Sequence, residues 1–564
     1  MPRAPTDKAT AIVLLARSLE AARTVEGRPL LAIIPDEDNF NDYNMRHYAY
    51  LYLLAEDGEE TRVNLRIMFV GSSNAKDYIK SVVSAESPIY PIEQVEVPFC
   101  SLQGEAMQYR QLVEGIGFDN AVFALRAMHD VVLANLEQED DEVIALTLAE
   151  DFHVGVVRSA TRYTAYRRGG QYLRPKPRDA VDDAAATFPV KAPLPGSPEP
   201  VTVDFDFEPD PIFDDRACVL IGRNGVGKTQ LLRSIVEGLT DEGAREDVTS
   251  ADIGKSARFT RTIVFSSVPS DPYRKSIPPW FDIDYEYFAV AADPHPLGRA
   301  FLQSLLDALR DDGSAFGADG TLRTRAQLLE VSLEQLGMWK RLYVPLRPKT
   351  RAAAFRSHIE VDGIAYVALH ERYNERQKNQ LASFIDMSGT AVVLSDRMEP
   401  RRLSSGELAM IQFAAQAAAS VENGSLLLFD EPETHLHPNY VSQFMDLLQE
   451  LLARSRSVAI IATHSAYVLR EVPRQRVTVL SRDEDGTILA DRPRMQTFGA
   501  NIDDLSQFVF IDSAVSARYR ERLETWGKTE GREIGIDGII ERYGNQLSST
   551  TLSIVAHAIR ADQF

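Results

Sequence analysis

The chain has 564 residues, of which 44% are hydrophobic and 25% are charged, and its formal net charge is −21. This length predicts two to four structural units, and the composition is that of a soluble globular protein without a run of about 20 apolar residues that could span a membrane. The acidic balance argues against a uniformly basic surface that coats nucleic acid, and the two cysteines exclude a disulfide framework and fit a cytoplasmic protein.

The N-terminal part is predicted to be rich in strands. The run "ATAIVLLARSLEAA" at residues 9–22 favours a surface helix rather than a signal peptide, because Arg17 and Glu20 interrupt it. Strands are expected at 30–34, 46–54 and 62–70, and helices at about 104–150. Nine prolines between Arg174 and Pro211 indicate a loop or linker.

From residue 201 onward, strands alternate with helices. Strands are predicted at "VTVDFDF", "TAVVLS", "SLLLFDE" and "SVAIIATHS", and helices at 296–310, 323–343, 370–386 and 439–453. The pair "RVTVLSR" and "TILADRP" predicts a hairpin at "DEDG", and the tail from 514 is expected to be helical. This order predicts an α/β fold with a mostly parallel sheet between helices.

The stretch "GRNGVGKTQLL" matches the Walker A pattern between a predicted strand and helix. Its glycines let backbone N–H groups converge on phosphate oxygens at a helix N-terminus. Lys228 is positioned to reach the β- and γ-phosphates of a nucleoside triphosphate, and Thr229 to bind Mg²⁺. The predicted phosphate-binding residues are Gly222, Asn224, Gly225, Gly227, Lys228, Thr229 and Gln230.

The stretch "SLLLFDEPE" places Asp430 and Glu431 at the end of an apolar strand. A first carboxylate in this position can hold Mg²⁺, and a second one directly after it can polarise an attacking water. Together with Walker A, this order predicts hydrolysis of ATP with Mg²⁺.

The stretch "LSSGE" at 403–407 resembles the LSGGQ signature of the ABC-type ATPase superfamily. Ser405 replaces the first glycine and Glu407 the glutamine, which suits the branch related to SMC, Rad50 and OLD proteins. The resemblance implies that Ser404 and Gly406 contact the γ-phosphate bound to another protomer. It also identifies His464 in "IIATHS" as the switch histidine.

The stretch "DEPETHLHP" resembles the Walker B and D-loop region of OLD-like defence ATPases. Together, "IGRNGVGKTQLL", "NFNDYNMRHYAYLYL" and "TFGANIDDLSQFVF" resemble the ATPase subunits of Septu and certain retron anti-phage systems. This implies N-terminal strands that complete the ATPase head, a helical insertion and a linker over 1–200. It further implies a Walker A lobe at 201–290, a helical lid insert at 291–400, a lobe with signature, Walker B and switch histidine at 401–512, and C-terminal helices at 513–564.

Three features depart from that family or stay open. No glutamine follows the strand "RTIVFSS", so Ser266, Ser267 or Asp271 could take the role of the Q-loop glutamine. Asp483 and Asp485 are interpreted as a hairpin turn rather than a TOPRIM nuclease centre, so no nuclease centre is expected in this chain. His435 and His437 are interpreted as contacts at a dimer seam rather than a metal pair, because further ligand spacing is missing.

Two segments reverse the acidic balance. Residues 158–178 hold seven basic residues and three tyrosines without an acid, and residues 340–356 hold six basic residues without an acid. Each could form a nucleic-acid groove, a solvated face or an interface to an acidic partner protein. The second segment is slightly preferred for nucleic acid, through Lys340, Arg341, Arg347, Lys349 and Arg351.

The leading hypothesis is a head-to-tail dimerising ATPase that binds two ATP molecules and controls a separately encoded effector nuclease in bacterial anti-phage defence. The resemblance implies an HNH-type nuclease as the partner, along with a reverse transcriptase and its non-coding RNA, or DNA, as further components. Turnover in such ATPases can be slow. The alternative is a RecF-like repair or recombination ATPase that acts directly on DNA, whereas a transporter ATPase is disfavoured by the N-terminal portion, the insert and the D-loop.

Overall fold

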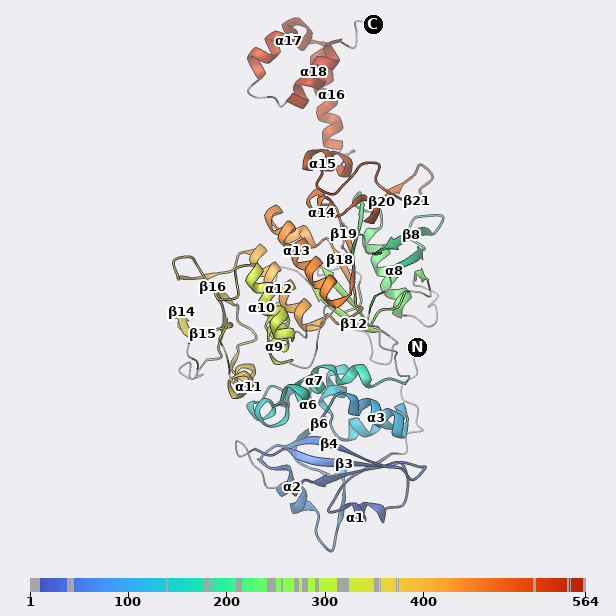
Figure 1. Cartoon of the computed structure of the whole chain (residues 1–564), viewed down its shortest axis with the longest axis vertical. Helices are drawn as coiled ribbons and strands as arrows, with labels where there is room; N and C mark the ends of the chain where they lie inside the picture. Colours follow the sequence, from blue (N-terminus) through green and yellow to red (C-terminus); the bar gives the residue numbers. More distant parts are fainter. Residues whose placement is uncertain are drawn as a thin grey trace. The chain divides into compact units, whose positions relative to one another are not determined.

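The computed structural model divides the chain into two compact units, Met1–Phe498 and Gly499–Phe564. Figure 1 traces the chain from its blue N-terminal strands to its red C-terminal helices. The described residues are 11–37, 45–137, 140–175, 183–184, 186–208, 216–240, 250–254, 257–267, 273–275, 283–289, 294–311, 324–348, 355, 357–371, 373, 375–510, 514–544, 547 and 549–560.

The N-terminal strands form a six-stranded sheet of their own, in the order β5-β1-β2-β3-β4-β6. Its strands are β1 (Ile12–Ala16), β2 (Leu30–Pro35), β3 (Tyr48–Leu54), β4 (Glu60–Phe69), β5 (Ile89–Pro91) and β6 (Phe99–Gln103). The prediction that these strands complete the ATPase head is therefore wrong. Each strand pairs within this sheet, and its apolar side chains close a separate core.

The surface helix expected at residues 9–22 is also wrong. The segment forms β1, which runs parallel to β2 and is almost entirely buried, followed by the short helix α1 (Leu19–Arg23). Ser18 caps α1 by accepting a hydrogen bond from the Ala21 amide at 3.3 Å. A five-residue apolar run is short for a helix and fits a strand buried on both faces.

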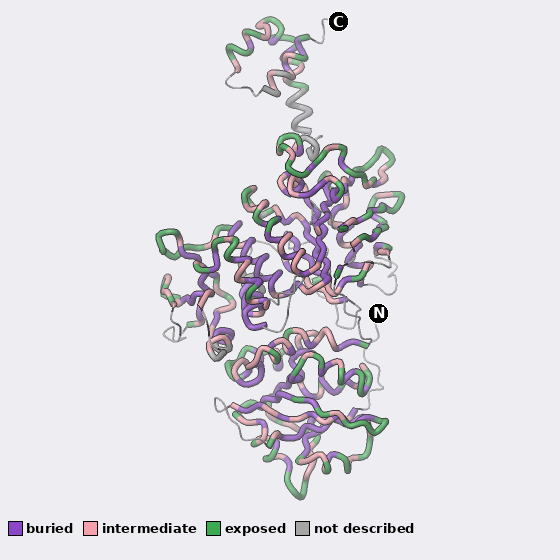
Figure 2. Tube along the Cα trace, in the orientation of Figure 1, coloured by how far each residue is buried: buried purple, intermediate pink, exposed green. Residues whose placement is uncertain are grey.

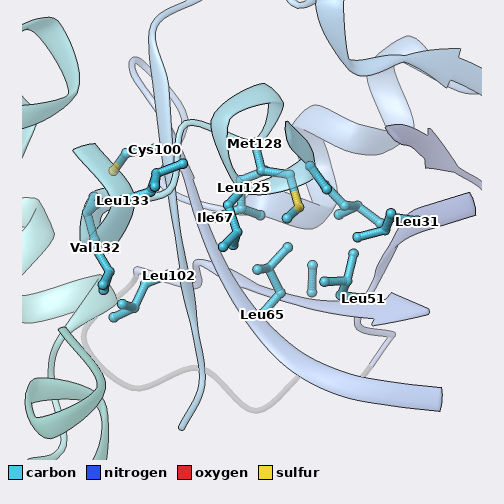
Figure 3. Close-up of a cluster of buried hydrophobic side chains, with 14 of the residues drawn as sticks. Leu31, Leu51, Leu65, Ile67, Cys100, Leu102, Leu125, Met128, Val132 and Leu133 are labelled. Carbon is cyan, nitrogen blue, oxygen red and sulfur yellow. The ribbon is translucent and has the colours of Figure 1, made fainter. Parts of the chain in front are cut away.

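Helices cover this N-terminal sheet. They are α2 (Ala75–Val82), α3 (Met107–Ile116), α4 (Phe118–Ala127), α5 (Val131–Glu137), α6 (Asp141–Leu146) and α7 (Ala160–Arg168), so the helices predicted for 104–150 are confirmed. Figure 3 shows strand residues Leu51, Leu65 and Ile67 in one buried cluster with Leu125 and Met128 of the α4 region. This core is a cluster of its own, separate from the core formed by the later strands and helices.

The second large sheet has seven strands in the order β12-β11-β18-β19-β9-β20-β21. They are β9 (Ala217–Gly222), β11 (Arg261–Ser266), β12 (Asp284–Ala289), β18 (Leu426–Asp430), β19 (Val458–Thr463), β20 (Val477–Arg482) and β21 (Ile488–Asp491). All neighbouring pairs are parallel except β20 and β21, which form the predicted hairpin. The predicted α/β fold with a mostly parallel sheet is thus confirmed.

Helices lie on both faces of this sheet (Figure 1). They are α8 (Lys228–Thr240), α12 (Ser405–Ser420), α13 (Pro438–Ser455) and α14 (Ala466–Arg470). Phe429 of β18 packs against Phe413 of α12 and Phe444 of α13, while Leu428 belongs to the cluster that contains α8. Figure 2 shows the central strands as a continuous buried region.

A three-stranded sheet, β10-β7-β8, packs on the same core as α8. Its strands are β7 (Thr187–Ala192), β8 (Val201–Asp206) and β10 (Asp252–Ile253). The strand at "VTVDFDF" is confirmed, but β7 lies inside the segment that was expected to be a loop. Phe188, Val190 and Ala192 alternate with exposed residues, and this period of two outweighs the high proline content.

The insert between β12 and α12 is only partly helical. It contains α9 (Pro294–Arg310), α10 (Arg325–Gln335) and α11 (Glu375–Phe384). It also holds a five-stranded sheet in the order β14-β15-β13-β16-β17, formed by β13 (Leu342–Pro345), β14 (His358–Val361), β15 (Ile364–Ala368), β16 (Val392–Leu394) and β17 (Pro400–Arg402). The prediction of a helical lid is therefore wrong for this antiparallel part, whose strands of three to five residues give a weak periodic signal.

The second unit is helical in its described part, as predicted for the tail. Its helices are α15 (Ile502–Phe510), α16 (Ala514–Lys528), α17 (Glu530–Tyr543) and α18 (Ser549–Arg560). Ile539, Val555 and Ile559 form its small core. None of the helices in the described residues of either unit has the length and hydropathy needed to cross a bilayer.

Candidate functional site

The Walker A loop joins β9 to α8, as the sequence predicted. Gly225 and Gly227 adopt φ values of 78° and 112°, which residues with a side chain rarely adopt. A Cβ atom on Gly222 would lie 2.5 Å from the Leu480 carbonyl oxygen. The glycines therefore allow a tight backbone loop at the N-terminus of a helix, where phosphate groups bind readily.

Lys228, the first residue of α8, is buried, and its Nζ donates a hydrogen bond to the Gly222 carbonyl at 2.9 Å. Burial lowers the pKa of Lys228 below its usual value, and the carboxylates of Glu431 and Asp430 oppose that shift. The ammonium group is thus held beside the loop, with carboxylates close enough to affect its charge.

Thr229 and Asp430 come together from elements that are 201 residues apart. The Thr229 hydroxyl donates to Asp430 Oδ1 at 3.1 Å. This contact arises because β9 and β18 both pair with β19 in parallel, which brings the Walker A loop and the end of β18 to one edge of the sheet. A hydroxyl and a carboxylate oxygen in contact form a donor set that suits Mg²⁺.

Tyr273 is a site residue that the sequence reasoning missed. Its hydroxyl donates to Asp430 Oδ2 at 3.1 Å, and the residue is buried. It lies in "PSDPY", just after β11, where no motif marked it. Tyr273 therefore fixes the second oxygen of the carboxylate whose first oxygen contacts Thr229.

Glu431 follows β18 in a left-handed backbone conformation, with φ 51° and ψ 54°. Its amide donates to the Ala462 carbonyl at 2.8 Å, and its carbonyl accepts from Ser267 Oγ at 2.7 Å. A non-glycine residue in this region is strained, and such strain accumulates at functional sites. Its carboxylate lies 3.4 Å from His464 Nδ1.

Glu433 is a second residue that the sequence reasoning did not select. Its Oε1 accepts hydrogen bonds from the Thr463 hydroxyl at 2.5 Å and from the His464 amide at 3.1 Å. The same oxygen lies 3.6 Å from His464 Nδ1. Glu433 is the third carboxylate in "DEPE", and this position next to Asp430 and Glu431 is the sequence feature that could have identified it. Glu433 ties the turn after β18 to the end of β19 and so positions His464 beside Glu431.

The candidates for the role of the missing Q-loop glutamine lie at the end of β11 or beyond it. Ser266 is buried in β11 and pairs with Asp430 in register. Ser267 follows it, and its amide also donates to the Asp430 carbonyl at 3.3 Å. Asp271 lies outside the described residues. The Ser267 hydroxyl contacts the turn after β18, and which residue takes the role of the glutamine stays a prediction.

The signature residues begin α12. Ser404 and Glu407 form a capping box, in which Ser404 Oγ accepts from the Glu407 amide at 3.3 Å and Glu407 Oε2 accepts from the Ser404 amide at 2.9 Å. The ion pair with Arg401 lowers the pKa of Glu407 to about 2, although burial opposes this. The replacement of glutamine by Glu407 thus has a local structural reason. Ser404 and Ser405 are exposed, whereas Gly406 is buried.

In the first basic segment, three of the described arginines form ion pairs within the chain. Arg167 pairs with Asp307 at 2.6 Å, Arg168 pairs with Glu422 at 2.9 Å, and Arg174 pairs with Asp284. The charges of these three arginines are therefore balanced within the chain, and a role of this segment in binding nucleic acid or an acidic partner stays a prediction. Their acidic partners lie in distant parts of the same chain.

In the second basic segment, two of the described arginines bind groups of the same chain. Arg341 contacts Asp396 at 3.0 Å and donates to the Leu394 carbonyl at 2.5 Å, and Arg347 donates to the Ile385 carbonyl at 3.2 Å. Lys340 is exposed. Lys349 and Arg351 lie outside the described residues. A role for this segment in nucleic-acid binding stays a prediction.

His437 caps α13, with its Nδ1 accepting from the Asn439 amide at 3.4 Å, and the side chain of His435 is not described. Within the described residues, no group of three or more His, Cys, Asp or Glu side chains has the geometry of a metal site. Mg²⁺ in nucleotide sites uses few protein ligands, and Thr229 with Asp430 are the described residues that could hold it.

Comparisons with known proteins agree with this geometry. Residues 256–470 match the family described as "AAA domain, putative AbiEii toxin, Type IV TA system". The chain is 25% identical to Protein ea59 of Escherichia phage lambda over 523 residues, which are 90% of this chain and 91% of that protein. It is 26% identical over 207 residues to the methionine import ATP-binding protein MetN of Streptococcus pneumoniae, covering 36% of this chain and 52% of MetN.

Solved structures similar to the chain include an ATP-binding cassette of an ABC transporter in its ADP conformation, with a TM-score of 0.28, 12% identity and coverage of 58% of this chain and 98% of that one. The SMC head domain from Thermotoga maritima gives a TM-score of 0.26 at 11% identity, with coverage of 54% and 98%. The Walker A loop, the carboxylates after β18 and the sequence matches together show that the chain carries an ATPase domain.

Proposed function

We propose that this chain is an ATP-binding and ATP-hydrolysing sensor whose copies associate head-to-tail around two ATP molecules. In the cytoplasm it controls a separately encoded effector nuclease in bacterial anti-phage defence. The ATPase part rests on the site described above. The regulatory part rests on the sequence resemblance of "DEPETHLHP", "NFNDYNMRHYAYLYL" and "TFGANIDDLSQFVF" to defence ATPases.

One observation carries the proposed association. Lys228, Thr229 and Asp430 gather at one sheet edge, whereas Ser404 and Ser405 are exposed at the separate N-terminus of α12. An exposed helix N-terminus with hydroxyl groups is suited to bind a phosphate. A signature that faces solvent in one protomer is available to the nucleotide of another.

Within one protomer, Lys228 would bind the phosphates of ATP, and Thr229 and Asp430 would hold Mg²⁺, which would supply charge neutralisation at the phosphate oxygens. Glu431 would accept a proton from the attacking water, and Glu433 holds His464 beside it. Tyr273 keeps the Asp430 carboxylate in orientation through its hydroxyl.

The association is tested with the full chain carrying Glu431→Gln, which keeps the shape of the site and removes the base. Analytical ultracentrifugation is run without nucleotide, with ADP and with ATP. We expect a dimer with ATP alone, because Ser404 of one protomer completes the site of the other only when the γ-phosphate is present. An unchanged sedimentation coefficient with ATP would contradict the proposal.

The control compares two helix-capping serines. Ser404→Ala and Ser18→Ala each remove an N-cap hydroxyl, from α12 and α1 respectively. Both lose capping of about 1 kcal/mol. Only Ser404→Ala is expected to weaken the ATP-dependent dimer, and equal effects of both would show that the loss is one of stability.

The regulatory role is tested by co-purification. We expect a nuclease encoded beside this chain to co-purify with it, and Glu431→Gln to change protection in a phage plaque assay. The RecF-like alternative predicts instead steeply salt-dependent DNA binding by the chain alone, lost when Lys340, Arg341 and Arg347 are neutralised.

A further inference from the structure

Helix α12 connects the signature to a distant set of charged residues. It begins after the Ser404 cap and ends at Ser420, so its 16 residues span about 24 Å at 1.5 Å per residue. Most of its residues are buried against neighbouring elements. A helix of this length transmits the position of its C-terminal end to its N-terminal end.

Three arginines bind the last carbonyl groups of α12. Arg325 donates to the Ala418 carbonyl at 2.8 Å and Arg261 to the Ser420 carbonyl at 2.9 Å. Arg168 donates to the Ala419 carbonyl at 3.3 Å. Cations are favourable here, because the last carbonyls of a helix lack intrahelical partners and carry partial negative charge.

Glu422 follows the helix and binds the same three arginines. Its Oε1 lies 2.9 Å from Arg168, 3.6 Å from Arg261 and 3.8 Å from Arg325. Gln171 adds a hydrogen bond at 3.2 Å. Burial alone would raise the pKa of Glu422, but the three arginines lower it to about 2. The carboxylate is therefore ionised throughout the physiological range.

A second carboxylate closes the set. Asp311 lies 2.9 Å from Arg168 and 3.2 Å from Arg325. We call Arg168, Arg261, Arg325, Asp311 and Glu422 the junction. These five side chains meet at the negative end of α12 and are largely buried, and Arg261 also lies 3.3 Å from Glu286.

The three arginines come from three different parts of the fold. Arg168 ends α7, which covers the N-terminal sheet, and Arg325 begins α10 in the insert. Arg261 begins β11, which pairs with the Walker B strand β18. The C-terminal end of the signature helix is therefore fixed to the N-terminal region, to the insert and to the ATPase sheet.

We propose that the junction positions the signature for ATP and that, through Arg168, it makes the ATP site responsive to the state of the N-terminal region. This rests on the proposed ATP-dependent association. Arg168 is a positioning residue, since it acts on the γ-phosphate of the partner only through α12 and Ser404. Without Arg168, the Ala419 carbonyl and the Glu422 carboxylate each lose a cationic partner. The C-terminal end of α12 is then held less firmly, and so is the signature at its N-terminal end.

The test introduces Arg168→Gln into the full chain with Glu431→Gln and measures ATP-dependent association. We expect the dimer dissociation constant to rise at least fivefold, while the affinity of the monomer for a fluorescent ATP analogue changes less than twofold. Arg168→Lys keeps the charge but loses the planar fork, and is expected to give a smaller increase. Arg126→Gln, which breaks the exposed pair with Glu137 on α4 and α5, is the matched control and should have no effect.

A double-mutant cycle separates positioning from simple stability. If Arg168 acts through the signature, Arg168→Gln adds little once Ser404→Ala is present, because the contact it positions is already lost. Independent, additive effects would overturn the proposal, as would an unchanged dimer or a parallel loss of ATP affinity. If Glu431→Gln itself fails to associate with ATP, the proposed function falls and this inference with it. If it associates and Arg168→Gln does so equally, the inference alone falls.

Discussion

The ATP site and the junction are both clusters of charged residues, but they are organised in opposite ways. At the ATP site, three carboxylates and Lys228 gather around a backbone loop whose glycines keep it open to a phosphate. At the junction, three arginines bind two carboxylates and three helix carbonyls of the same chain. The ATP site is arranged around a loop that can receive a phosphate, whereas the junction arginines bind carboxylates and helix carbonyls of the same chain.

Both regions join residues that are distant in the sequence, but only the ATP site is marked by local motifs. The ATP site is read from residues that stand next to one another in "GRNGVGKT" and "FDEPE". The junction pairs Arg168 with Glu422 across 254 positions and Arg261 with Ser420 across 159. A run of basic residues therefore predicts a binding surface only where its side chains are not paired with carboxylates from distant parts of the chain.

The largest expected effect concerns the ATP site. Glu431→Gln removes the proton acceptor and should lower ATP turnover about 10²–10⁴-fold. Glu433→Gln keeps an oxygen for Thr463 and His464 and should cost less than tenfold. Phosphate release at saturating ATP measures both. Similar losses in the two variants would show that the turn after β18 acts as a structural unit rather than through Glu431.

The next effect concerns stability at the junction. Glu422→Gln leaves buried arginines without their carboxylate and should lower the free energy of unfolding by about 3–5 kcal/mol. The control Glu137→Gln breaks the pair with Arg126, whose side chain is 47% exposed, and should cost at most about 1 kcal/mol. Urea unfolding followed by circular dichroism measures the difference. Equal losses would remove the distinction between the junction and an ordinary surface pair.

The loss of unfolding free energy in Glu422→Gln should also depend on pH. The pKa of Glu422 in the folded state is about 2, below the usual value of 4.5. Between these two pH values, the folded state therefore binds fewer protons than the unfolded state. Its stabilisation is fully present above pH 4.5 and is lost as the pH falls toward 2. The gap in unfolding free energy between the wild type and Glu422→Gln should therefore narrow below pH 4.5. A gap that stays constant down to pH 2.5 would contradict the ion pairing.

The smallest expected effect concerns Tyr273, which orients the Asp430 carboxylate in the ATP site. Tyr273→Phe removes one hydrogen bond to Asp430, which is worth about 1 kcal/mol, so turnover should fall about fivefold. Tyr285→Phe is the control, because its hydroxyl binds the Arg274 carbonyl instead. Steady-state turnover at fixed Mg²⁺ measures both. An unchanged rate for Tyr273→Phe would show that the Thr229 contact alone orients the carboxylate.

The sequence by itself determined the α/β fold of the ATPase region and the meeting of Walker A with Asp430. It did so because strands of one parallel sheet end at one edge, and "ACVLIG" and "SLLLFD" are long enough to be read as strands. It also predicted the hairpin at "DEDG" and the helical tail, since these depend on turn residues and periodicity within a few positions.

Only the tertiary structure decided the rest. The run "IVLLA" is equally apolar as a helix or as a strand, and its pairing with β2 chose the strand. The N-terminal strands closed a sheet of their own because their apolar faces found helices from the same region. Tyr273, Glu433 and the partners of the basic segment were set by contacts between distant residues, whose identity no local pattern records.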